Sequence, residues 1–417
     1  MAAHDASFYQ ASDGRPHEQR LREQEALLRS VLTKAVETSA AVREALAASG
    51  LSPRTITLPD LAKLPLLRKE ALPAAQAGAP PFGRWLGVRV ADLRRIFVSP
   101  GPIYDPEGRD PDYWGFAPAL HAAGFHRGDV VLNAFSHHLT PAGAMFDGAL
   151  GVLGCVAVPS GVGNLEIQAK TALDLGASGF IGTPSFLAAL LAKMEELRAR
   201  SPLRVAFISD EPLADSQRTD LERRFRLRVH QGYAIGDLGL IAYECPRRSG
   251  LHVDDRVVVE LIDPKSGATA SGGVPGEVVV TFLNPVYPIL RLATGDLSQF
   301  APGDCPCGRT APRLERILGR LGEAVKVRGI FIHPHELDRA IARHPQVRRY
   351  QVIVTRVGSQ DELTVRVESD VPDRAALAET VAQSVRDATR LRATVEVIPP
   401  GMVWTEDKKI VDRRTWD

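Results

Sequence analysis

The chain has 417 residues, which is enough for two or three domains of ordinary size. Hydrophobic residues make up 44% and charged residues 24%, so we exclude a disordered polymer, a fibre and a small disulfide scaffold. Lysine and arginine (51) nearly balance aspartate and glutamate (50), and a net charge of +1 gives no overall attraction to nucleic acid or to an anionic membrane. The four cysteines are sparse enough to favour a reducing compartment, and we expect a cytoplasmic protein.

In chain order, residues 18–48 repeat apolar side chains at spacings of three and four, which predicts an amphipathic helix. Residues 58–72 predict a short helix and a proline-containing turn. Beyond residue 94, short apolar runs alternate with helical segments up to residue 230, a pattern typical of βαβ units and a largely parallel sheet. The longest weakly polar run, residues 139–163, is too interrupted by proline and aspartate to span a membrane.

After residue 230 the helical pattern stops, and strands with Gly/Pro turns follow up to about residue 319. Residues 320–417 predict the order helix, two strands, helix and strand, which is typical of a small α+β unit. We therefore predict a large multi-layer α/β domain over residues 1–319, with a helical leader over 1–93, and a small mobile α+β domain over 320–417.

Three cysteines and one histidine form the sharpest local pattern. Cys245 and His252 lie in one loop region, and Cys305 and Cys307 flank a proline in another. Three thiolates and an imidazole meet the demand of a closed, structural Zn²⁺ site if the sheet brings the two loops together. The alternative is four unrelated residues, since these spacings are not those of standard zinc fingers. Cys155, in an apolar run, is expected to be an ordinary core residue.

A second pattern is LRLATGDLS, in which a strand ends in Thr-Gly-Asp. A carboxylate at this turn, that of Asp296, can accept hydrogen bonds from the two hydroxyls of a ribose. Near the end of the chain, TEDKKIVDRR (405–414) carries two adjacent lysines in a polar loop.

Taken in order, the segments resemble the phenylacetate-CoA ligase family of the adenylate-forming superfamily. The resemblance covers nearly the whole chain, and it depends on the number, order and spacing of the motifs more than on any one of them. The motifs are LPDLAKLPLLRKEAL (58–72), GCVAVPSGVGN (154–164), GTPSFL (182–187), DEPL (210–213), QGYAIGDLGLIAYEC (231–245), PILRLATGD (288–296), CPCGRTAPRLERILGR (305–320) and VKVRGIFIHPHEL (325–337).

The resemblance implies a two-step reaction. A carboxylate attacks the α-phosphate of ATP to give an acyl-adenylate and pyrophosphate, and the thiol of coenzyme A then displaces AMP. The implied cofactors are ATP, Mg²⁺ and coenzyme A, the implied partner is a small, aromatic or other organic, carboxylic acid, and a homodimer is one assembly to expect.

The resemblance also assigns roles to individual residues. Tyr233 would stack on adenine, and Asp237 would stand where the family has its Mg²⁺-associated acidic residue. Asp296 would bind the ribose hydroxyls. The remaining residues at nucleotide-binding motifs are Arg320, Glu211, Pro212, Ser99 and Gly101.

The catalytic lysine of the family is expected near the end of the chain, where Lys409 and Lys408 are the candidates. Alignment on Lys-Ile favours Lys409, whereas alignment on VDRR would place the lysine position near Glu406. Arg320 would lie at the hinge of the small domain, where Gly322 stands in place of the usual acidic residue and leaves the backbone free to rotate.

The chain departs from the family at the phosphate loop. In place of a Ser/Thr/Gly run closed by lysine, it reads RIFVSPGPIYDPEGRDPDYW, with Arg109 as the only nearby cation. Prolines here lack amide hydrogens, and acidic residues such as Asp105 would repel a triphosphate. The sequence therefore predicts either a different mode of ATP binding or an impaired first step.

The acyl pocket is expected to include NAFSHHLTPAG (133–143), in which His137 and His138 could contact the acid or could be plain surface residues. The leading hypothesis is an acid-CoA ligase with a structural Zn²⁺. Two alternatives stay open: transfer of the acyl group to a carrier-protein thiol, and a ligase-like protein that binds nucleotide or acyl ligands but has lost adenylation.

Overall fold

A computed structural model describes residues 8–264, 266–270, 274–321, 325–332, 334–358, 360–400 and 408–414. The chain separates into two compact units. The first runs to Asp210 and resumes over Arg218–Gly319, and the second comprises Glu211–Gln217 and the chain from Arg320 onwards.

The helical leader is two helices rather than the single helix expected over residues 18–48. Ser39 interrupts the run because its hydroxyl accepts a hydrogen bond from the Val42 amide (3.3 Å) and so caps the second helix. Leu28 and Leu32 of the first helix are fully buried in an apolar cluster with Leu283 and other residues. The leader contains η1 (Ala11–Gly14), α1 (His17–Thr38), α2 (Ala40–Ala48), η2 (Pro59–Lys63), β1 (Leu67–Arg68), η3 (Lys69–Ala71), α3 (Leu72–Gly78) and η4 (Val90–Asp92).

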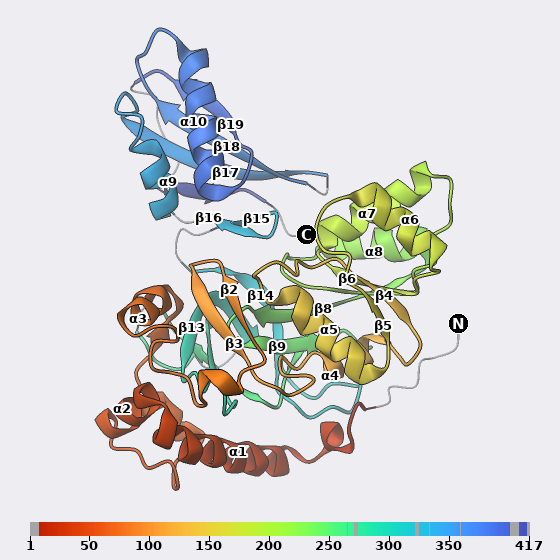
Figure 1. Cartoon of the computed structure of the whole chain (residues 1–417), viewed down its shortest axis with the longest axis vertical. Coiled ribbons are helices and arrows are strands. Elements are labelled where there is room, and N and C mark those ends of the chain that lie inside the picture. The colour runs from red at the N-terminus through yellow and green to blue at the C-terminus, as the bar shows by residue number, and fades with distance from the viewer. Residues whose placement is uncertain are drawn as a thin grey trace. The chain divides into compact units, whose positions relative to one another are not determined.

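The parallel sheet predicted from the alternating segments is present. Its strands lie in the order β8-β7-β6-β4-β5, all parallel. Figure 1 shows α6, α7 and α8 grouped on one side of these strands, with α4 and α5 on the other. The elements are α4 (Ala117–Ala123), β4 (Val130–Asn133), α5 (Ala142–Leu153), β5 (Val156–Val158), α6 (Leu165–Asp174), β6 (Gly179–Gly182), α7 (Pro184–Glu196), β7 (Val205–Ile208), α8 (Asp215–Phe225) and β8 (Arg228–Ile235).

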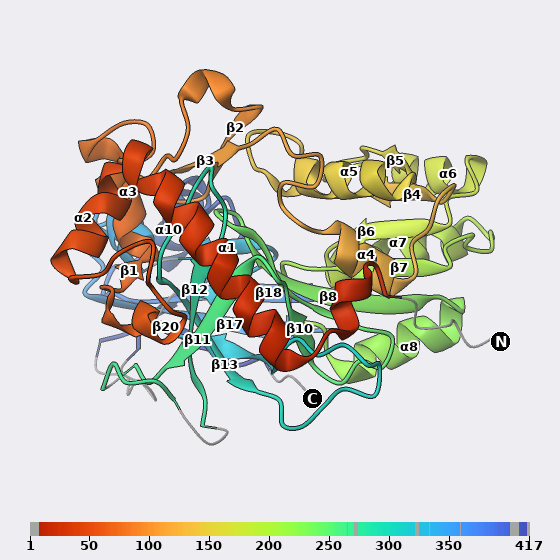
Figure 2. The same cartoon turned by 90° about the horizontal axis from the view of Figure 1, so that it is seen from below.

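The same sheet continues with antiparallel strands in the order β11-β12-β13-β14-β10-β9 up to β8. With β1, which pairs in parallel with β13, the sheet has twelve strands. In Figure 2, α1 crosses this antiparallel part of the sheet. Both parts are dominated by Val, Ile, Leu and aromatic side chains that are buried on both faces. The strands are β9 (Gly239–Glu244), β10 (Leu251–Val253), β11 (Val257–Ile262), β12 (Gly276–Phe282), β13 (Leu292–Phe300) and β14 (Arg313–Arg320).

A separate two-stranded antiparallel sheet occupies the phosphate-loop segment. It is a hairpin of β2 (Arg95–Ser99) and β3 (Ile103–Glu107). One face of the hairpin is buried and carries Ser99 and Asp105, whereas Tyr104 on the other face is exposed.

The second unit contains the predicted order of helix, two strands, helix and strand, and adds β15 and β16 before it and β20 after it. Its four-stranded sheet has the order β19-β18-β17-β20, and α9 and α10 pack together over its apolar core. The elements are β15 (Val325–Val327), β16 (Ile330–Ile332), α9 (Pro334–Ile341), β17 (Arg349–Val357), β18 (Gln360–Glu368), α10 (Arg374–Thr389), β19 (Thr394–Ile398) and β20 (Ile410–Asp412).

One core assignment from the sequence was wrong. Cys155 is only half-buried and lies before β5, an edge strand in which Val156 is 56% exposed. An edge strand covers one side only, which is why this apolar run does not enclose the thiol. Among the described residues, no helix is long and apolar enough to cross a membrane.

Candidate nucleotide site and metal centre

The strand order reverses between β4 and β6, and α/β sheets bind ligands at the carboxyl ends of strands beside such a reversal. Three segments meet there. The Val98 amide of β2 donates to the Leu139 carbonyl of the loop after β4 (2.8 Å). A Cβ at Gly236, just after β8, would lie 3.2 Å from Ser99 Cβ and 3.9 Å from Pro141 Cγ. The predicted site segments are therefore neighbours.

The Thr-Gly-Asp turn holds its carboxylate beside the predicted adenine residue. Tyr233 donates its hydroxyl hydrogen to Asp296 Oδ2 (2.8 Å) and lies 3.2 Å from Thr294 Oγ1. Asp296 is partly exposed, and its own amide donates to Thr294 Oγ1 (3.1 Å). The arrangement fixes the direction of a carboxylate that still faces solvent, as recognition of two vicinal hydroxyls requires.

The turn itself depends on residues that the sequence had not singled out. Gly295 adopts φ +78°, which favours glycine, and its amide donates to Glu277 Oε1 (3.1 Å). The buried Glu277 carboxylate is bound in turn by Arg68 Nη1, at 3.0 and 2.8 Å. Arg68 reaches it because β1 pairs in parallel with β13. The signal in the sequence was the adjacent Arg-Lys pair in the segment LPLLRKEAL.

The second residue of that pair lies against Asp237. Lys69 Nζ is 2.5 Å from Asp237 Oδ2, and the Asp237 side chain is fully buried. The expectation that Arg109 is the only cation near the phosphate-loop segment is therefore wrong. Lys69 comes from a distant part of the chain, and sequence spacing alone does not show that it folds onto this place.

A second carboxylate is buried at the same place. Asp105 is fully buried, and neither of its oxygens has a hydrogen-bond partner among the described residues. Burial raises the pKa of Asp105 well above its usual range, Asp237 raises it further, and Ser99 and Lys69 partly oppose the shift. The Ser99 hydroxyl also has no hydrogen-bond partner in the described part of the chain. Ser99, Asp105 and Asp237 thus form a buried oxygen-rich cluster beside one ammonium group.

The hairpin that carries this cluster is not a phosphate-wrapping loop. Its two strands pair with each other, with Phe97 opposite Asp105 and Ser99 opposite Ile103. Gly101 is exposed at the turn, and a Cβ there would lie 2.7 Å from Ile103 Cγ1. The predicted departure from the family pattern therefore has a defined structural form, a short paired hairpin with a buried acid.

The two histidines of the predicted acyl pocket differ in environment. His137 Nε2 lies 3.0 Å from Asp147 Oδ2, and Asn133 donates to Asp147 Oδ1 (2.8 Å). His138 is exposed. The imidazole of His137 is thus held in place at the carboxyl end of β4, whereas His138 fits the surface interpretation.

The four predicted metal ligands are brought together. One ligand atom from each of the residues can be chosen so that all four lie within 4.8 Å of one another, and all four residues are buried. Cys245 Sγ is 3.6 Å from Cys305 Sγ, and Cys307 Sγ is 3.5 Å from His252 Nε2. A tetrahedral ion with metal–sulfur bonds of about 2.3 Å holds its sulfurs roughly 3.8 Å apart, so the donor set fits Zn²⁺.

The sheet explains why these ligands meet. β10, which carries His252, pairs with β9 on one side and β14 on the other. Cys245 directly follows β9, and the loop before β14 carries Cys305 and Cys307. A hydrogen bond with Cys245 lowers the pKa of the Cys307 thiol, and His252 lowers it further. One thiolate is therefore favoured even without an ion, as metal binding needs.

The candidate lysines belong to the second unit. Lys409 directly precedes β20, and its ammonium group lies 2.7 and 2.9 Å from the two oxygens of Asp338. Tyr350 donates to the same carboxylate (2.7 Å). Lys408 is exposed, and its carbonyl accepts from Gln351 (2.9 Å).

The remaining predicted nucleotide residues are described only in part. Glu211 is half-buried and Pro212 is exposed, in the short segment after β7 that groups with the second unit. Arg320 ends β14, and its side chain lies outside the described part of the chain, as do Gly322 and Glu406.

Comparisons with known proteins agree with this geometry. Residues 329–414 match the model of the AMP-binding enzyme C-terminal domain. The phenylacetate-coenzyme A ligase of Thermus thermophilus is 28% identical over 423 residues, covering 93% of this chain and 94% of the relative. That of Aromatoleum evansii is 28% identical over 407 residues, with 89% of each chain covered. The chain is thus similar to phenylacetate-CoA ligases over most of its length, and its C-terminal residues match the AMP-binding enzyme C-terminal domain.

Solved structures of the superfamily share the fold. 2-Hydroxyisobutyryl-CoA ligase in complex with 2-HIB-AMP and CoA, in the thioesterification state, matches with a TM-score of 0.86 at 24% identity, covering 97% of this chain and 91% of the other. The same enzyme in the postadenylation state with 2-HIB-AMP gives a TM-score of 0.71, covering 96% and 91%. The predicted fold class and the resemblance to the phenylacetate-CoA ligase family are confirmed.

Proposed function

We propose that the protein is an ATP-dependent acid-CoA ligase that activates an aromatic or other small carboxylic acid through an acyl-adenylate. The observation that carries the proposal is the candidate ribose site, formed by Tyr233 and Asp296. Here Tyr233 orients the partly exposed Asp296 carboxylate at the Thr-Gly-Asp turn. Relatives over most of the chain are phenylacetate-CoA ligases, and the structural neighbour binds an acyl-AMP and CoA.

In the first step, the acid's carboxylate oxygen attacks the α-phosphorus of ATP, and the bond to pyrophosphate breaks. Negative charge gathers on the phosphate oxygens, and a cation placed there lowers the barrier. We assign this cation to Lys409, whose ammonium group is paired with Asp338 in the second unit. In the second step, the coenzyme A sulfur attacks the acyl carbon and AMP leaves.

Mg²⁺ is the metal that this chemistry commonly uses, and the oxygen donors here suit it. Mg²⁺ binds carboxylate oxygens in preference to softer donors, and the buried oxygens of Asp105 lack hydrogen-bond partners among the described residues. We propose Asp237, with Asp105 and Ser99 beside it, as the residues that would hold the ion. Lys69 would share the binding of the phosphate charge at this place.

We further propose that Cys245, His252, Cys305 and Cys307 hold a structural Zn²⁺. With four protein ligands, no position is left for a substrate, so the ion would fasten the two loops without taking part in the chemistry. The described cysteines are free, which fits a reducing, cytoplasmic location.

The hairpin with its buried acid supports a second candidate, a ligase-like protein that binds nucleotide but no longer adenylates. The deciding experiment is carboxylate-dependent exchange of pyrophosphate into ATP with a panel of aromatic and short-chain acids, beside AMP binding by calorimetry. Exchange supports the ligase, whereas AMP binding without exchange for any acid supports the binding protein. A mass spectrum of the thioester then separates coenzyme A from a carrier-protein thiol as the acceptor.

A further inference from the structure

Arg309 is a buried cation next to the proposed metal centre. Its side chain is 2% exposed, and none of its three guanidinium nitrogens has a hydrogen-bond partner among the described residues. Other buried arginines of this unit differ: Arg218 binds both oxygens of Glu244, at 2.8 and 3.0 Å, and Arg291 binds both oxygens of Glu260. The ion pair of Arg309 is longer, with 3.9 Å between its Nε and Asp13 Oδ2.

A buried guanidinium with a single long ion pair is poorly compensated, so a second negative charge near it would stabilise the fold. The thiolate ligands supply one. The Arg309 amide donates to Cys307 Sγ (3.4 Å), so the arginine and the sulfur belong to the same tight turn. Three thiolates, one neutral imidazole and one Zn²⁺ carry a net charge of −1, and that charge would be as deeply buried as the arginine.

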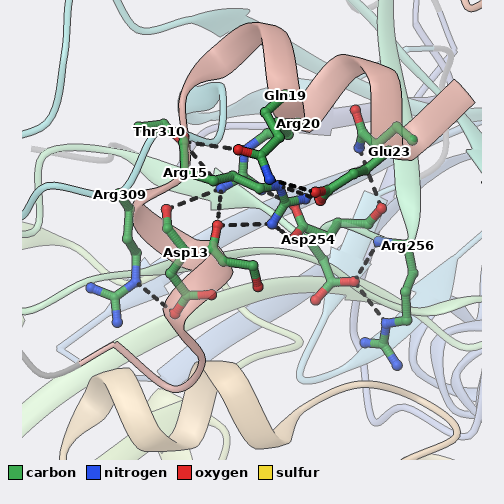
Figure 3. A network of polar contacts seen from close by, with 12 residues as sticks. Asp13, Arg15, Gln19, Arg20, Glu23, Asp254, Arg256, Arg309 and Thr310 are labelled. Atoms are coloured by element: carbon green, nitrogen blue, oxygen red, sulfur yellow. Dashed lines mark hydrogen bonds and ion pairs between the residues drawn. The ribbon is translucent and has the colours of Figure 1, made fainter.

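The same turn is joined to the beginning of the described chain (Figure 3). The Thr310 hydroxyl donates to the Arg15 carbonyl, and the Thr310 amide donates to the Asp13 carbonyl (3.1 Å). Arg20 of α1 donates to Thr310 Oγ1 (3.2 Å) and to the Asp13 carbonyl (3.0 Å). The Phe8 ring lies against the Arg309 guanidinium, with its centroid 5.5 Å away. Arg309 and Thr310 therefore contact both the loop that carries Cys305 and Cys307 and the N-terminal segment.

This connection is largely polar, and the segment adds aromatic contacts through Phe8, against Arg309, and Tyr9, against His121 and the core. Arg20 also forms an ion pair with Asp255, so the segment is bound on both sides by charged groups. In a buried network, removing one charge leaves its partners uncompensated and weakens the neighbouring hydrogen bonds. A continuous set of contacts therefore connects the metal centre to the first helix within one unit.

We propose that Arg309 is a positioning residue that balances the charge of the thiolate–metal centre, and that metal occupancy thereby holds residues 8–20 against the body. The proposal depends on the proposed metal site. Loss of the ion by chelation would free the loop that carries Cys305, Cys307, Arg309 and Thr310, and would thereby release the N-terminal segment.

The test uses the full-length, zinc-loaded protein. Zinc release is followed with a chromogenic chelator, and amide hydrogen exchange of residues 8–20 is followed by mass spectrometry with and without the ion. Chelation should speed exchange of this segment at least tenfold. Arg309→Met should release zinc about 10–100-fold faster, the usual effect of losing a supporting residue around a metal. Arg309→Lys, which keeps the charge, should stay within about threefold of the natural protein.

Thr310→Val is the matched variant, because it removes the hydrogen bonds of the Thr310 hydroxyl with Arg15 and Arg20 and leaves Arg309 in place. It should speed exchange of residues 8–20 and leave zinc release unchanged, and it keeps the test informative if Arg309→Met fails to fold. Equal zinc release from the natural protein and Arg309→Met, or equal exchange with and without the ion, would overturn the proposal. A natural protein that contains no zinc would instead overturn the metal site itself.

Discussion

Two buried polar clusters lie in the large unit, and they differ in how they are built. At the metal centre, the four ligands come from two loops that neighbouring strands hold together. At the hairpin, Asp105, Asp237 and Lys69 come from three separate parts of the chain. The first cluster is complete as a ligand set, whereas the second leaves buried carboxylate oxygens without hydrogen-bond partners among the described residues. From this difference we expect the first cluster to stabilise the fold and the second to take part in the chemistry.

The largest effect is expected at the metal centre. Cys307→Ser should lower the zinc content from about one ion per chain to near zero, and the unfolding midpoint by about 10 °C or more, because binding of structural Zn²⁺ contributes directly to folding. Elemental analysis and thermal unfolding measure the two quantities. Cys155→Ser, outside the cluster, is the control and should change neither. If the natural protein contained no zinc and had normal stability, the proposal that this cluster is a metal centre would be wrong.

The next largest effect is expected on the rate of adenylation and not on stability. Lys409→Ala should slow carboxylate-dependent pyrophosphate exchange by about 10²–10³-fold, the usual cost of losing a charge that stabilises a transition state, with little change in stability. Thioester formation from a supplied acyl-adenylate should be nearly unchanged.

Lys408→Ala is the control for this variant, since Lys408 is exposed and adjacent in sequence. Normal exchange by Lys409→Ala, with a defect in Lys408→Ala, would transfer the role to Lys408. A loss of zinc in either variant would contradict the separation between the two clusters.

A smaller effect is expected at the hairpin, and it depends on pH. The native state keeps a proton on Asp105 because burial raises its pKa, whereas the unfolded chain releases that proton near pH 4. Stability should therefore fall as pH rises above about 4 towards the raised pKa. Asp105→Asn should remove this dependence and stabilise the protein at pH 8 by about 1–3 kcal/mol.

Denaturant unfolding at pH 5 and pH 8 measures this effect, and Asp110→Asn is the control because Asp110 is exposed. An Asp105→Asn protein that is less stable at both pH values would mean that the ionised carboxylate makes a stabilising contact. The hairpin cluster would then be structural, like the metal centre.

The smallest effects are expected at the candidate ribose site. Asp296→Ala should weaken AMP binding about tenfold, because the hydrogen bonds to a charged acceptor are lost. Tyr233→Phe keeps the ring and removes only the hydroxyl that orients Asp296, so it should weaken binding only about threefold. Calorimetry with AMP measures both. Equal losses in the two variants would show that orientation of the carboxylate matters as much as its charge.

Much of the fold was readable from the sequence, because apolar periodicity reports which face of an element is buried. The pattern of short apolar runs predicted β4 to β7 with α5 to α7, and in the second unit the order α9, β17, β18, α10, β19 was correct, without β15, β16 and β20. The exceptions have local causes. Ser39 caps a new helix inside the predicted one, and Cys155 precedes an edge strand that does not enclose it.

The sequence by itself determined the fold class and the resemblance to phenylacetate-CoA ligases. It also singled out the four candidate metal ligands, because cysteine and histidine are rare residues with a narrow ligand chemistry. Only the tertiary structure decided which charges are buried together. Arg68 and Lys69 reach Glu277 and Asp237 because β1 joins the sheet beside β13, a pairing between residues more than two hundred positions apart. A buried charge is recognised by the partners that surround it, and those partners are set by strand order rather than by spacing along the chain.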